Sequence, residues 1–315
     1  TLPMFHCNGW GMPYAMTGMG GKHIVLRKVD GPEILRRIAE HGVTLLCGAP
    51  AVLSAVLDAA ADWDGEIPGR GTMRCVVAGA PPPTRTIERV ETELGWEFIQ
   101  IYGLTETAPL LTMNRNRSEW DDDTPAERAA RLSRAGAPAL GVTLSTAPDG
   151  ELLARSNHVL KSYWDQPEAT SAALADDWFH TGDGATIDDD NFATITDRKK
   201  DVIISGGENV SSIEVEDTLF SHPAVAEVAV IGVPDEKWGE TIKALVVLAP
   251  GAGTGTNGES VDEAALIDHC REKLAHFKCP TSVEFRDELA RTATGKLQKF
   301  KLRAPYWEGM AKQIN

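Results

Sequence analysis

The sequence is short of cysteine and aromatic residues, and it has no long apolar run. Its five cysteines among 315 residues include no C-x-x-C pair, which argues against a disulfide framework and a structural zinc site. No stretch approaches the roughly 18 consecutive apolar residues of a membrane-spanning helix, and the first residues lack the pattern of a signal peptide. We therefore expect a cytoplasmic protein with no integral membrane segment.

Basic residues are also scarce. The chain has 31 Lys and Arg against 46 Asp and Glu, which gives a net charge of −15. Non-specific binding to nucleic acid requires a basic surface, so we expect no nucleic-acid partner. An acidic protein can still bind an anionic nucleotide or coenzyme, because a binding site needs only local positive charge.

Short β-rich runs alternate with helical periodicity over the first hundred residues. We expect strands at residues 24–26, 43–47, 73–78 and 97–102, and helices that begin at residue 30 and that cover residues 51–61 and 84–94. This alternation implies βαβ units around a buried parallel sheet. Residues 115–134 are polar and irregular, which indicates a solvated excursion from that sheet.

The later residues indicate a different architecture. A Pro-Asp-Gly turn at residues 148–150 and a hairpin at residues 187–195 predict antiparallel strands. Beyond Lys199 and Lys200 we expect helices at residues 212–220 and 262–274, with strands at 225–233, 241–248 and 283–285. The fold class is therefore α/β: residues 1–198 form part of a large βαβ domain with a small β-rich subdomain, and residues 199–315 form a small α+β domain.

Two motifs fifteen positions apart carry chemistry that suits a ribose. The first is the His-Thr-Gly-Asp run that ends at Asp183, and the second is an Asp-Arg-Lys-Lys run that contains Arg198. A carboxylate can accept hydrogen bonds from two neighbouring hydroxyls, and a guanidinium supplies planar donors. The alternative interpretation is a surface salt bridge of little energetic value.

A third motif follows the strand predicted at residues 97–102. It contains Tyr102, Gly103, Thr105 and Glu106, and open α/β sheets bind ligands at this end of their strands. A Tyr ring can stack on adenine, a Thr hydroxyl can donate to a phosphate, and a Glu carboxylate is a hard ligand for Mg²⁺. An ordinary turn with a core Tyr and a surface Glu is the alternative.

Together with a Thr-Ala-Thr-Gly-Lys turn that ends at Lys296, these motifs resemble the adenylate-forming superfamily, and most of all its fatty-acyl-CoA ligases. The resemblance implies an acid–thiol ligase, that is, an acyl-CoA synthetase. A carboxylic acid, expected to be a fatty acid, reacts with ATP to give an acyl-adenylate and pyrophosphate, and CoA then displaces AMP. The implied cofactors are ATP, Mg²⁺ and CoA. The implied partners are these small molecules, with a homodimer as one allowed assembly.

The resemblance also implies a role for each matching residue. Thr105 contacts the α-phosphate, Glu106 holds Mg²⁺, and Lys296 supplies positive charge to the first step. The other matching residues are implied to bind the ribose (Asp183, Arg198), to border the adenine and acyl pocket (Gly79, Ala80, Tyr102, Gly103) and to line the pantetheine tunnel (Gly206, Gly207, Trp238). Lys200 is implied to be the hinge of a mobile small domain, and His6 to border the carboxylate site. For Lys200, His6 and Trp238, an ordinary structural role is the alternative. Ala290 departs from the family, which usually has Pro there.

One element of the family is missing from the sequence. A Ser/Thr/Gly-rich loop that grips the β- and γ-phosphates precedes the Pro-Met-Phe-His motif in the family, and this sequence begins at that motif, at residues 3–6. We therefore expect a fragment or a truncated homologue that binds ATP weakly and catalyses poorly or not at all. Two alternatives stay open: an adenylating enzyme that loads a carrier-protein pantetheine, and a catalytically silent nucleotide- or acyl-binding remnant.

Overall fold

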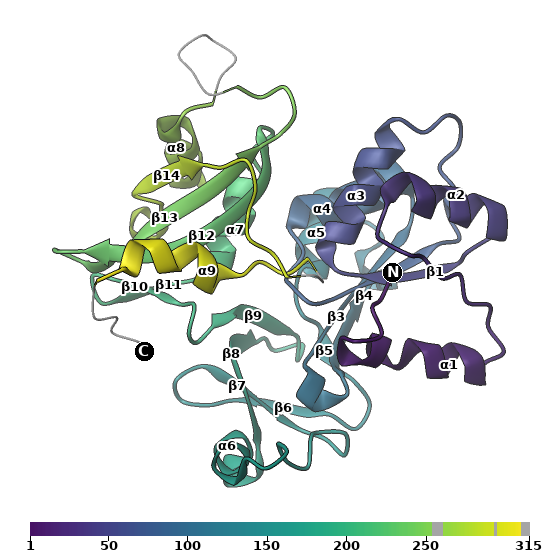
Figure 1. The fold of residues 1–315 in the computed structure, drawn as a ribbon, viewed down its shortest axis with the longest axis horizontal. Helices are drawn as coiled ribbons and strands as arrows, with labels where there is room; N and C mark the ends of the chain where they lie inside the picture. The colour runs from purple at the N-terminus through teal and green to yellow at the C-terminus, as the bar shows by residue number, and fades with distance from the viewer. Residues whose placement is uncertain (254–260, 293–294, 310–315) are drawn as a thin grey trace. The chain divides into compact units, whose positions relative to one another are not determined.

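The computed structural model describes residues 1–253, 261–292 and 295–309. The chain divides into two compact units: the first comprises Thr1–Thr181 and Ala185–Ile195, and the second comprises Gly182–Gly184 and Thr196–Asn315. Each unit combines helices and sheets (Figure 1), so the α/β class predicted from the sequence is confirmed. A functional domain boundary after residue 198 remains a proposal.

The first unit is built on a five-stranded sheet with the order β1-β2-β3-β4-β5. Its strands are β1 (Leu45–Gly48), β2 (Arg74–Val77), β3 (Glu97–Gly103), β4 (Leu110–Arg115) and β5 (Ala137–Pro138). The first three strands are parallel, whereas β3, β4 and β5 pair antiparallel. The expectation of a parallel sheet is thus correct only for β1 to β3. The segment between β3 and β4 has only a few residues, whereas a parallel crossover needs a dozen or more.

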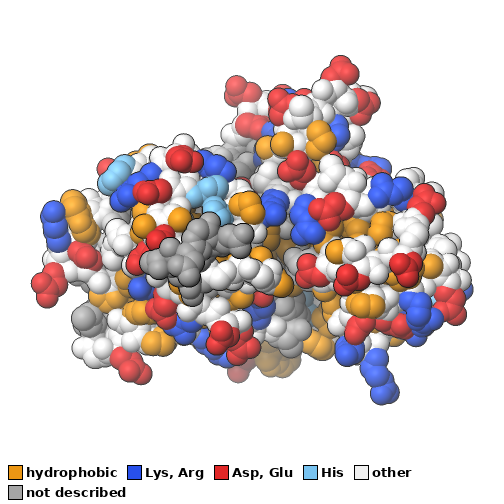
Figure 2. Space-filling view, turned by 90° about the horizontal axis from the view of Figure 1, so that it is seen from above, with side chains coloured by type: hydrophobic (Ala, Val, Ile, Leu, Met, Phe, Trp, Pro, Cys, Tyr) orange, Lys and Arg blue, Asp and Glu red, His pale blue; other side chains and the backbone are white. Residues whose placement is uncertain are grey.

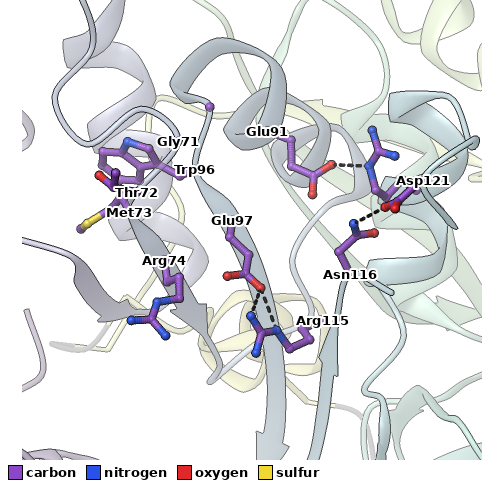
Figure 3. A pocket seen from close by; sticks show the side chains of 12 residues that line it. Gly71, Thr72, Met73, Arg74, Glu91, Trp96, Glu97, Arg115, Asn116 and Asp121 are labelled. Atoms are coloured by element: carbon purple, nitrogen blue, oxygen red, sulfur yellow. Dashed lines mark hydrogen bonds and ion pairs between the residues drawn. The ribbon is translucent and has the colours of Figure 1, made fainter. Parts of the chain in front are cut away.

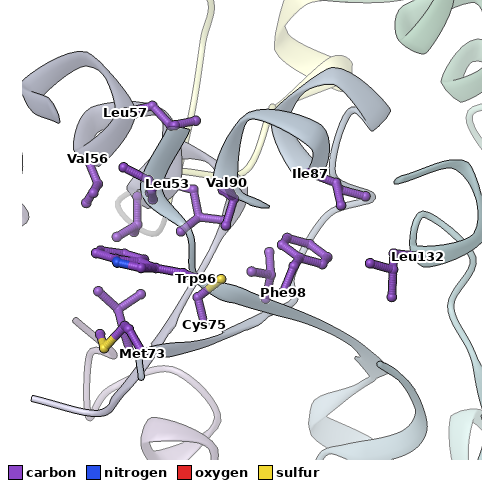
Figure 4. Packing of buried hydrophobic residues seen from close by; sticks show 14 of the residues in the cluster. Leu53, Val56, Leu57, Met73, Cys75, Ile87, Val90, Trp96, Phe98 and Leu132 are labelled. Carbon is purple, nitrogen blue, oxygen red and sulfur yellow. The ribbon is translucent and has the colours of Figure 1, made fainter. Parts of the chain in front are cut away.

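Helix α2 (Gly31–His41) precedes β1, while α3 (Pro50–Ala61) connects β1 to β2 and α4 (Thr84–Arg89) connects β2 to β3. A π-helical turn at Val90–Leu94 extends α4. Asp30 caps α2 by accepting a hydrogen bond from the backbone N of Glu33. Figure 4 shows Trp96, which directly precedes β3, and Phe98 of β3 packed against apolar side chains of α3 and α4. Burial of these large side chains fixes the sheet and therefore the loops at its carboxyl end.

Residues 24–26 do not form the strand that their composition favours. Val25 is 79% exposed, and the neighbouring segment leads directly into α2. A strand is stabilised by pairing with another strand and by burial of one face. Local β propensity alone does not supply either, so this prediction is wrong.

Residues 115–134 are more ordered than the predicted solvated excursion. They contain a 3₁₀ turn at Ser118–Trp120 and helix α5 (Pro125–Leu132). Thr124 and Glu127 form a capping box at the start of α5, and Ala129 and Leu132 are fully buried. The Thr-x-x-Glu signature of a helix start was present in the sequence. The polar composition of the surrounding residues instead led to the prediction of an irregular segment, although the helix has one buried face.

A second sheet has the order β6-β7-β8-β9. Its strands are β6 (Thr143–Thr146), β7 (Glu151–Arg155), β8 (Phe179–Ile187) and β9 (Ala193–Arg198). The predicted hairpins are confirmed, because β6 pairs antiparallel with β7 around the Pro-Asp-Gly turn and β8 neighbours β9. Helix α6 (Pro167–Ala173) lies between β7 and β8 in the sequence, and helix α1 (Met12–Gly18) lies near the start of the chain.

The second unit has a sheet with the order β11-β10-β13-β12, with β14 paired parallel to β13. Its strands are β10 (Ile203–Ser205), β11 (Glu208–Val210), β12 (Val225–Asp235), β13 (Gly239–Leu248) and β14 (Ser282–Phe285), and its helices are α7 (Ser212–Phe220), α8 (Glu263–Lys273) and α9 (Lys299–Arg303). Alternate residues of β12 enter two different clusters. Helices α7 and α8 pack on one face of the sheet, and α9 packs on the other.

Figure 2 shows acidic and basic side chains interspersed over the face that it draws. Among the residues that the structure describes, no helix combines the length and the apolar character needed to cross a membrane. All five cysteines have free thiols.

Candidate active site

The loop after β3 is held in one shape by its own backbone. A Cβ atom at Gly103 would lie 1.6 Å from the carbonyl oxygen of Pro109, so only glycine fits there. The buried Thr107 hydroxyl accepts from the Leu104 backbone N at 3.0 Å and contacts the Pro109 oxygen at 2.5 Å. Thr105 is exposed at the tip of this loop, where its hydroxyl is available to a ligand.

Glu106 is oriented by a segment that sequence reasoning missed. The Tyr163 phenol donates to Oε1 of Glu106 at 3.0 Å, and the Leu160 backbone N donates to the Glu106 carbonyl at 2.7 Å. Burial, and then the hydrogen bond and negative charge of Glu106, raise the pKa of the Tyr163 phenol. No spacing rule links positions 57 apart, so the sequence offered no signal for this pair.

The donor set around Glu106 fits Mg²⁺ but not a dedicated metal cage. Within the described ranges, no group of three or more His, Cys, Asp or Glu side chains converges on a metal position. Mg²⁺ is commonly held by one or two carboxylates together with substrate phosphates and water. Glu106 supplies one such carboxylate, and it is half-buried.

The segment that contains His6 is anchored at the same sheet. Trp10 packs against the cluster of Ala78, Ile99 and Ile101, and the Gly9 backbone N donates to the His6 carbonyl at 3.1 Å. The loop after β2 begins at Ala78, so Gly79 and Ala80 lie beside this anchor. Gly79 has a φ of +96°, a conformation that favours glycine. His6, Gly79, Ala80 and the Tyr102–Glu106 loop thus all belong to the first unit.

The structure brings Asp183 and Arg198 together. Nε of Arg198 lies 3.6 Å from Oδ1 of Asp183, and the side chains are 53% and 11% exposed, respectively. The Lys199 backbone N donates to the Gly182 carbonyl at 3.1 Å, which fixes the two strands beside each other. A sheltered carboxylate beside an exposed guanidinium can present both acceptors and donors to a diol.

Gly206 and Trp238 are also neighbours. The Gly206 backbone N donates to the Trp238 carbonyl at 2.9 Å, and a Cβ atom at position 206 would lie 2.7 Å from Cε3 of the indole. Trp238 is 49% exposed, and Nζ of Lys237 lies 4.4 Å from the centre of its ring. Gly207 has a φ of +88° with open space around it. Gly206 and Gly207 thus add no side chain to the surface beside the exposed indole of Trp238.

Lys296 sits in a tight loop that is closed by an antiparallel bridge between Arg291 and Leu297. The Lys296 backbone N donates to Oγ1 of Thr292 at 3.1 Å, and Arg291 donates to the Gly295 carbonyl at 2.7 Å. Two residues of the predicted turn, Ala293 and Thr294, lie outside the described residues. The half-buried Lys296 is therefore presented by a loop that is braced at both ends.

Lys200 lies in an exposed turn directly after β9. The Asp201 backbone N donates to the Arg198 carbonyl at 2.8 Å, and Nη1 of Arg303 donates to the Lys200 carbonyl at 3.3 Å. Lys200, the Asp183–Arg198 pair, the Gly206–Trp238 surface and Lys296 all belong to the second unit.

A cavity of about 870 Å³ opens elsewhere, at the amino ends of β2 and β3. Figure 3 shows ion pairs among its charged side chains, whereas Arg74 forms no ion pair with the other residues drawn. Glu97 contacts Arg115 at 2.6 Å, and Glu91 contacts Arg128 at 3.1 Å. This cavity lies at the opposite end of the strands from Thr105 and Glu106, so it is separate from the candidate site.

Two family profiles match the chain. The AMP-binding enzyme profile covers residues 1–164, and the AMP-binding enzyme C-terminal domain profile covers residues 214–296. The chain is 42% identical to the 2-methylpropanoate–CoA ligase CCL4 of Humulus lupulus over 96% of this chain and 55% of that protein. It is 39% identical to the acetate–CoA ligase CCL3 of the same plant over 100% of this chain and 57% of that protein. The chain thus spans about half the length of these relatives.

Solved structures of related enzymes superpose on the chain. ATP-bound MatB from Rhodopseudomonas palustris matches with a TM-score of 0.81 and 30% identity, over 97% of this chain and 59% of that one. The o-succinylbenzoate CoA synthetase MenE from Bacillus subtilis, in complex with its acyl-adenylate intermediate, matches with a TM-score of 0.77 and 29% identity. That match covers 100% of this chain and 60% of MenE.

Proposed function

Because the chain belongs to the family of AMP-binding enzymes, we propose that it is the later part of an AMP-forming acid–CoA ligase. In the first step a carboxylate oxygen attacks the α-phosphorus of ATP, and the bond to pyrophosphate breaks. In the second step the sulfur of CoA attacks the carbonyl carbon, the bond to AMP breaks, and the thiol proton passes to solvent. The products are an acyl-CoA, AMP and pyrophosphate.

The Asp183–Arg198 pair is the observation that carries this proposal. Asp183 is sheltered while Arg198 is exposed, at an Nε to Oδ1 distance of 3.6 Å. A simple surface ion pair has no reason to bury only its carboxylate, since exposed pairs are worth little. Binding of a ribose, whose two hydroxyls would donate to Asp183, accounts for the low exposure of this carboxylate.

The first step must overcome repulsion between two anions. The ammonium of Lys296 would neutralise charge that develops on the α-phosphate, and the exposed Thr105 hydroxyl would donate to a phosphate oxygen. When bound at Glu106, Mg²⁺ would screen the phosphates. Tyr102 and Gly103, with Gly79 and Ala80, would border the adenine and the acyl group.

The second step needs a path for a thiol. Gly206 and Gly207 would line that path because they add no side chain, and Trp238 would form one wall. His6 would border the reacting carboxylate where the thiol enters. We propose Lys200 as the hinge about which residues 199–315 move between the two steps, since a hinge is a few residues that absorb a change in φ and ψ.

The identity of the acid is a further proposal. We propose a fatty acid, taken broadly to include short aliphatic acids. Two relatives are named for 2-methylpropanoate and acetate, which supports testing short acids first. We also propose a cytoplasmic location, although one relative carries the name peroxisomal, and a homodimer as the assembly to test first.

Acid-dependent exchange of labelled pyrophosphate into ATP tests the proposal. The experiment uses the full-length gene product, with acetate, 2-methylpropanoate and a series of longer fatty acids. We expect exchange that requires the acid but not CoA, because adenylate formation precedes thiol attack. Thioester formation without exchange would contradict the mechanism. Comparing the rate of thioester formation with CoA and with a holo-carrier protein distinguishes a CoA ligase from the alternative, an enzyme that loads a carrier-protein pantetheine.

A further inference from the structure

A buried network of charged and polar side chains surrounds Lys299, the first residue of α9. Nζ of Lys299 contacts Oε1 of Glu216 at 2.7 Å and donates to Oγ of Ser212 at 2.5 Å. The Ser212 hydroxyl and backbone N donate to Oδ2 of Asp197 at 2.6 and 2.8 Å. The remaining Asp197 oxygen accepts from the Arg198 backbone N at 2.8 Å. Lys299 is thus linked to Arg198 through two side chains.

This network is sheltered from solvent. The side chains of Lys299 and Glu216 are 14% and 17% exposed, and Asp197 is 2% exposed. Burial opposes the charged form of Lys299, but the carboxylates of Glu216 and Asp197 outweigh it and raise the pKa of the ammonium. Lys299 is therefore charged at neutral pH and interacts with the buried carboxylates of Glu216 and Asp197, although burial raises the pKa of the Glu216 carboxyl. Removing one partner of such a group leaves uncompensated buried charge.

The network joins two parts of the second unit that the reaction uses. Lys299 is the first residue of α9, three positions after Lys296, while Asp197 immediately precedes Arg198. Helix α9 also reaches the turn at its other end, because Arg303 donates to the Lys200 carbonyl at 3.3 Å. The turn at residues 197–200 is therefore bonded to α7 through Ser212 and to α9 through Arg303.

We propose that Lys299 is a positioning residue that ties the end of β9, with Arg198, to the helix that follows the Lys296 loop. The catalytic consequence of this inference rests on the proposed function. The tie would keep Arg198, which binds the ribose, and Lys296, which neutralises charge, in fixed positions relative to each other during the first step. Asp197 precedes the proposed hinge and Ser212 follows it. Rotation about Lys200 therefore breaks the Ser212–Asp197 bond, and the second step does not depend on the tie.

The first test does not require activity. The run Arg198-Lys199-Lys200 offers trypsin three cleavage sites, and cleavage of a folded protein follows the population of the locally opened form. We compare Lys299→Met, which keeps the length of the side chain but removes the charge, with Lys299→Arg. The matched control is Lys278→Met, which removes an ammonium paired with Glu214 on the same helix α7, at 2.7 Å but at 28% exposure.

We expect Lys299→Met to raise the rate of cleavage at residues 198–200 by about tenfold or more, while Lys278→Met and Lys299→Arg stay within about threefold of wild type. A folded Lys299→Met protein that is cleaved at the wild-type rate overturns the proposal. If Lys299→Met does not fold, Ser212→Ala decides the question, because it removes the hydroxyl that joins Lys299 to Asp197 but leaves the Lys299–Glu216 pair in place. Ser212→Ala should raise cleavage severalfold, and an unchanged rate overturns the proposal.

The second test uses the two half-reactions of the full-length protein. We expect Lys299→Met to lower the kcat of pyrophosphate exchange by about tenfold, to leave thioester formation from a supplied acyl-adenylate near wild type, and to be rescued by Lys299→Arg. If Lys299 had a merely structural role, Lys299→Met would lower the rates of both half-reactions together, and that result contradicts the proposal. If the wild-type protein shows no exchange, the proposed function fails, while the trypsin comparison still decides whether Lys299 holds residues 198–200 in place.

Discussion

The phenol of Tyr163 donates a hydrogen bond to Oε1 of Glu106 across 3.0 Å, between residues 57 positions apart. The Leu160 backbone N holds the carbonyl of the same Glu106 at 2.7 Å. The carboxylate that we propose for Mg²⁺ is thus aimed by the segment between β7 and α6. Groups that orient a metal-binding carboxylate from outside commonly matter nearly as much as the ligand itself.

Replacement of Tyr163 by Phe should therefore weaken the response to Mg²⁺. We expect the Mg²⁺ concentration at half-maximal pyrophosphate exchange to rise about tenfold, because Glu106 loses the donor that orients it. The control is Tyr14→Phe, since Tyr14 is exposed and its hydroxyl accepts only from Asn8 among the bonds described for it. A Mg²⁺ titration of Tyr163→Phe that matches wild type would show that the hydrogen bond is incidental.

Replacement of Lys296 by Ala should affect only the first step. Loss of a preorganised positive charge at the developing anion should lower the exchange rate by about 10²- to 10³-fold. Thioester formation from a supplied acyl-adenylate should change little. Lys301→Ala is the control, because Lys301 is an exposed lysine on α9. Equal losses in both half-reactions would exclude the role that we assign to Lys296.

Replacement of Gly103 by Ala should destabilise the first unit. The new Cβ would lie 1.6 Å from the Pro109 oxygen, and backbone must move to relieve the clash. We expect a loss of about 3 kcal/mol in the free energy of unfolding, measured by urea denaturation. Gly18→Ala is the control, because its Cβ meets nothing within 4 Å. A Gly103→Ala protein as stable as Gly18→Ala would mean that the loop tolerates rearrangement.

Replacement of Gly206 by Ala should affect only the second step. The added methyl group would lie 2.7 Å from the Trp238 ring and displace it. We expect the KM for CoA to rise about tenfold while pyrophosphate exchange is unchanged. Gly239→Ala is the control, since Gly239 has a φ of +76° but open space around its Cβ position, so it shares the backbone strain without touching the indole. A normal KM for CoA in Gly206→Ala would remove this surface from the thiol path.

The sequence was sufficient for some of these relationships. The predicted hairpin at residues 187–195 turns the chain back on itself, so residues on its two strands become neighbours. Asp183 and Arg198 lie on those strands, and they are indeed 3.6 Å apart. The closeness of Gly206 to Trp238 needed the structure, because it depends on the pairing of β10 with β13 between Ser205 and Gly239.

Other features lay beyond reasoning from periodicity. The Tyr163–Glu106 bond joins segments with no common register, and the Lys299 network joins α9 to α7 and β9 through buried polar atoms. Helix α5 was predictable from its Thr124–Glu127 capping box, but the polar composition around it outweighed that signal. The strand predicted at residues 24–26 failed because pairing, rather than local propensity, decides whether a β-rich run forms a strand.

The fate of a carboxylate oxygen tests the central claim most directly. The full-length protein is given an acid labelled with oxygen-18 in its carboxylate, together with ATP, Mg²⁺ and CoA, and the nucleotide product is analysed by mass spectrometry. An acyl-adenylate intermediate predicts AMP that carries one labelled oxygen, because the phosphorus keeps the oxygen that attacked it. Formation of ADP with label in orthophosphate would contradict the account, since it would place an acyl phosphate in the path.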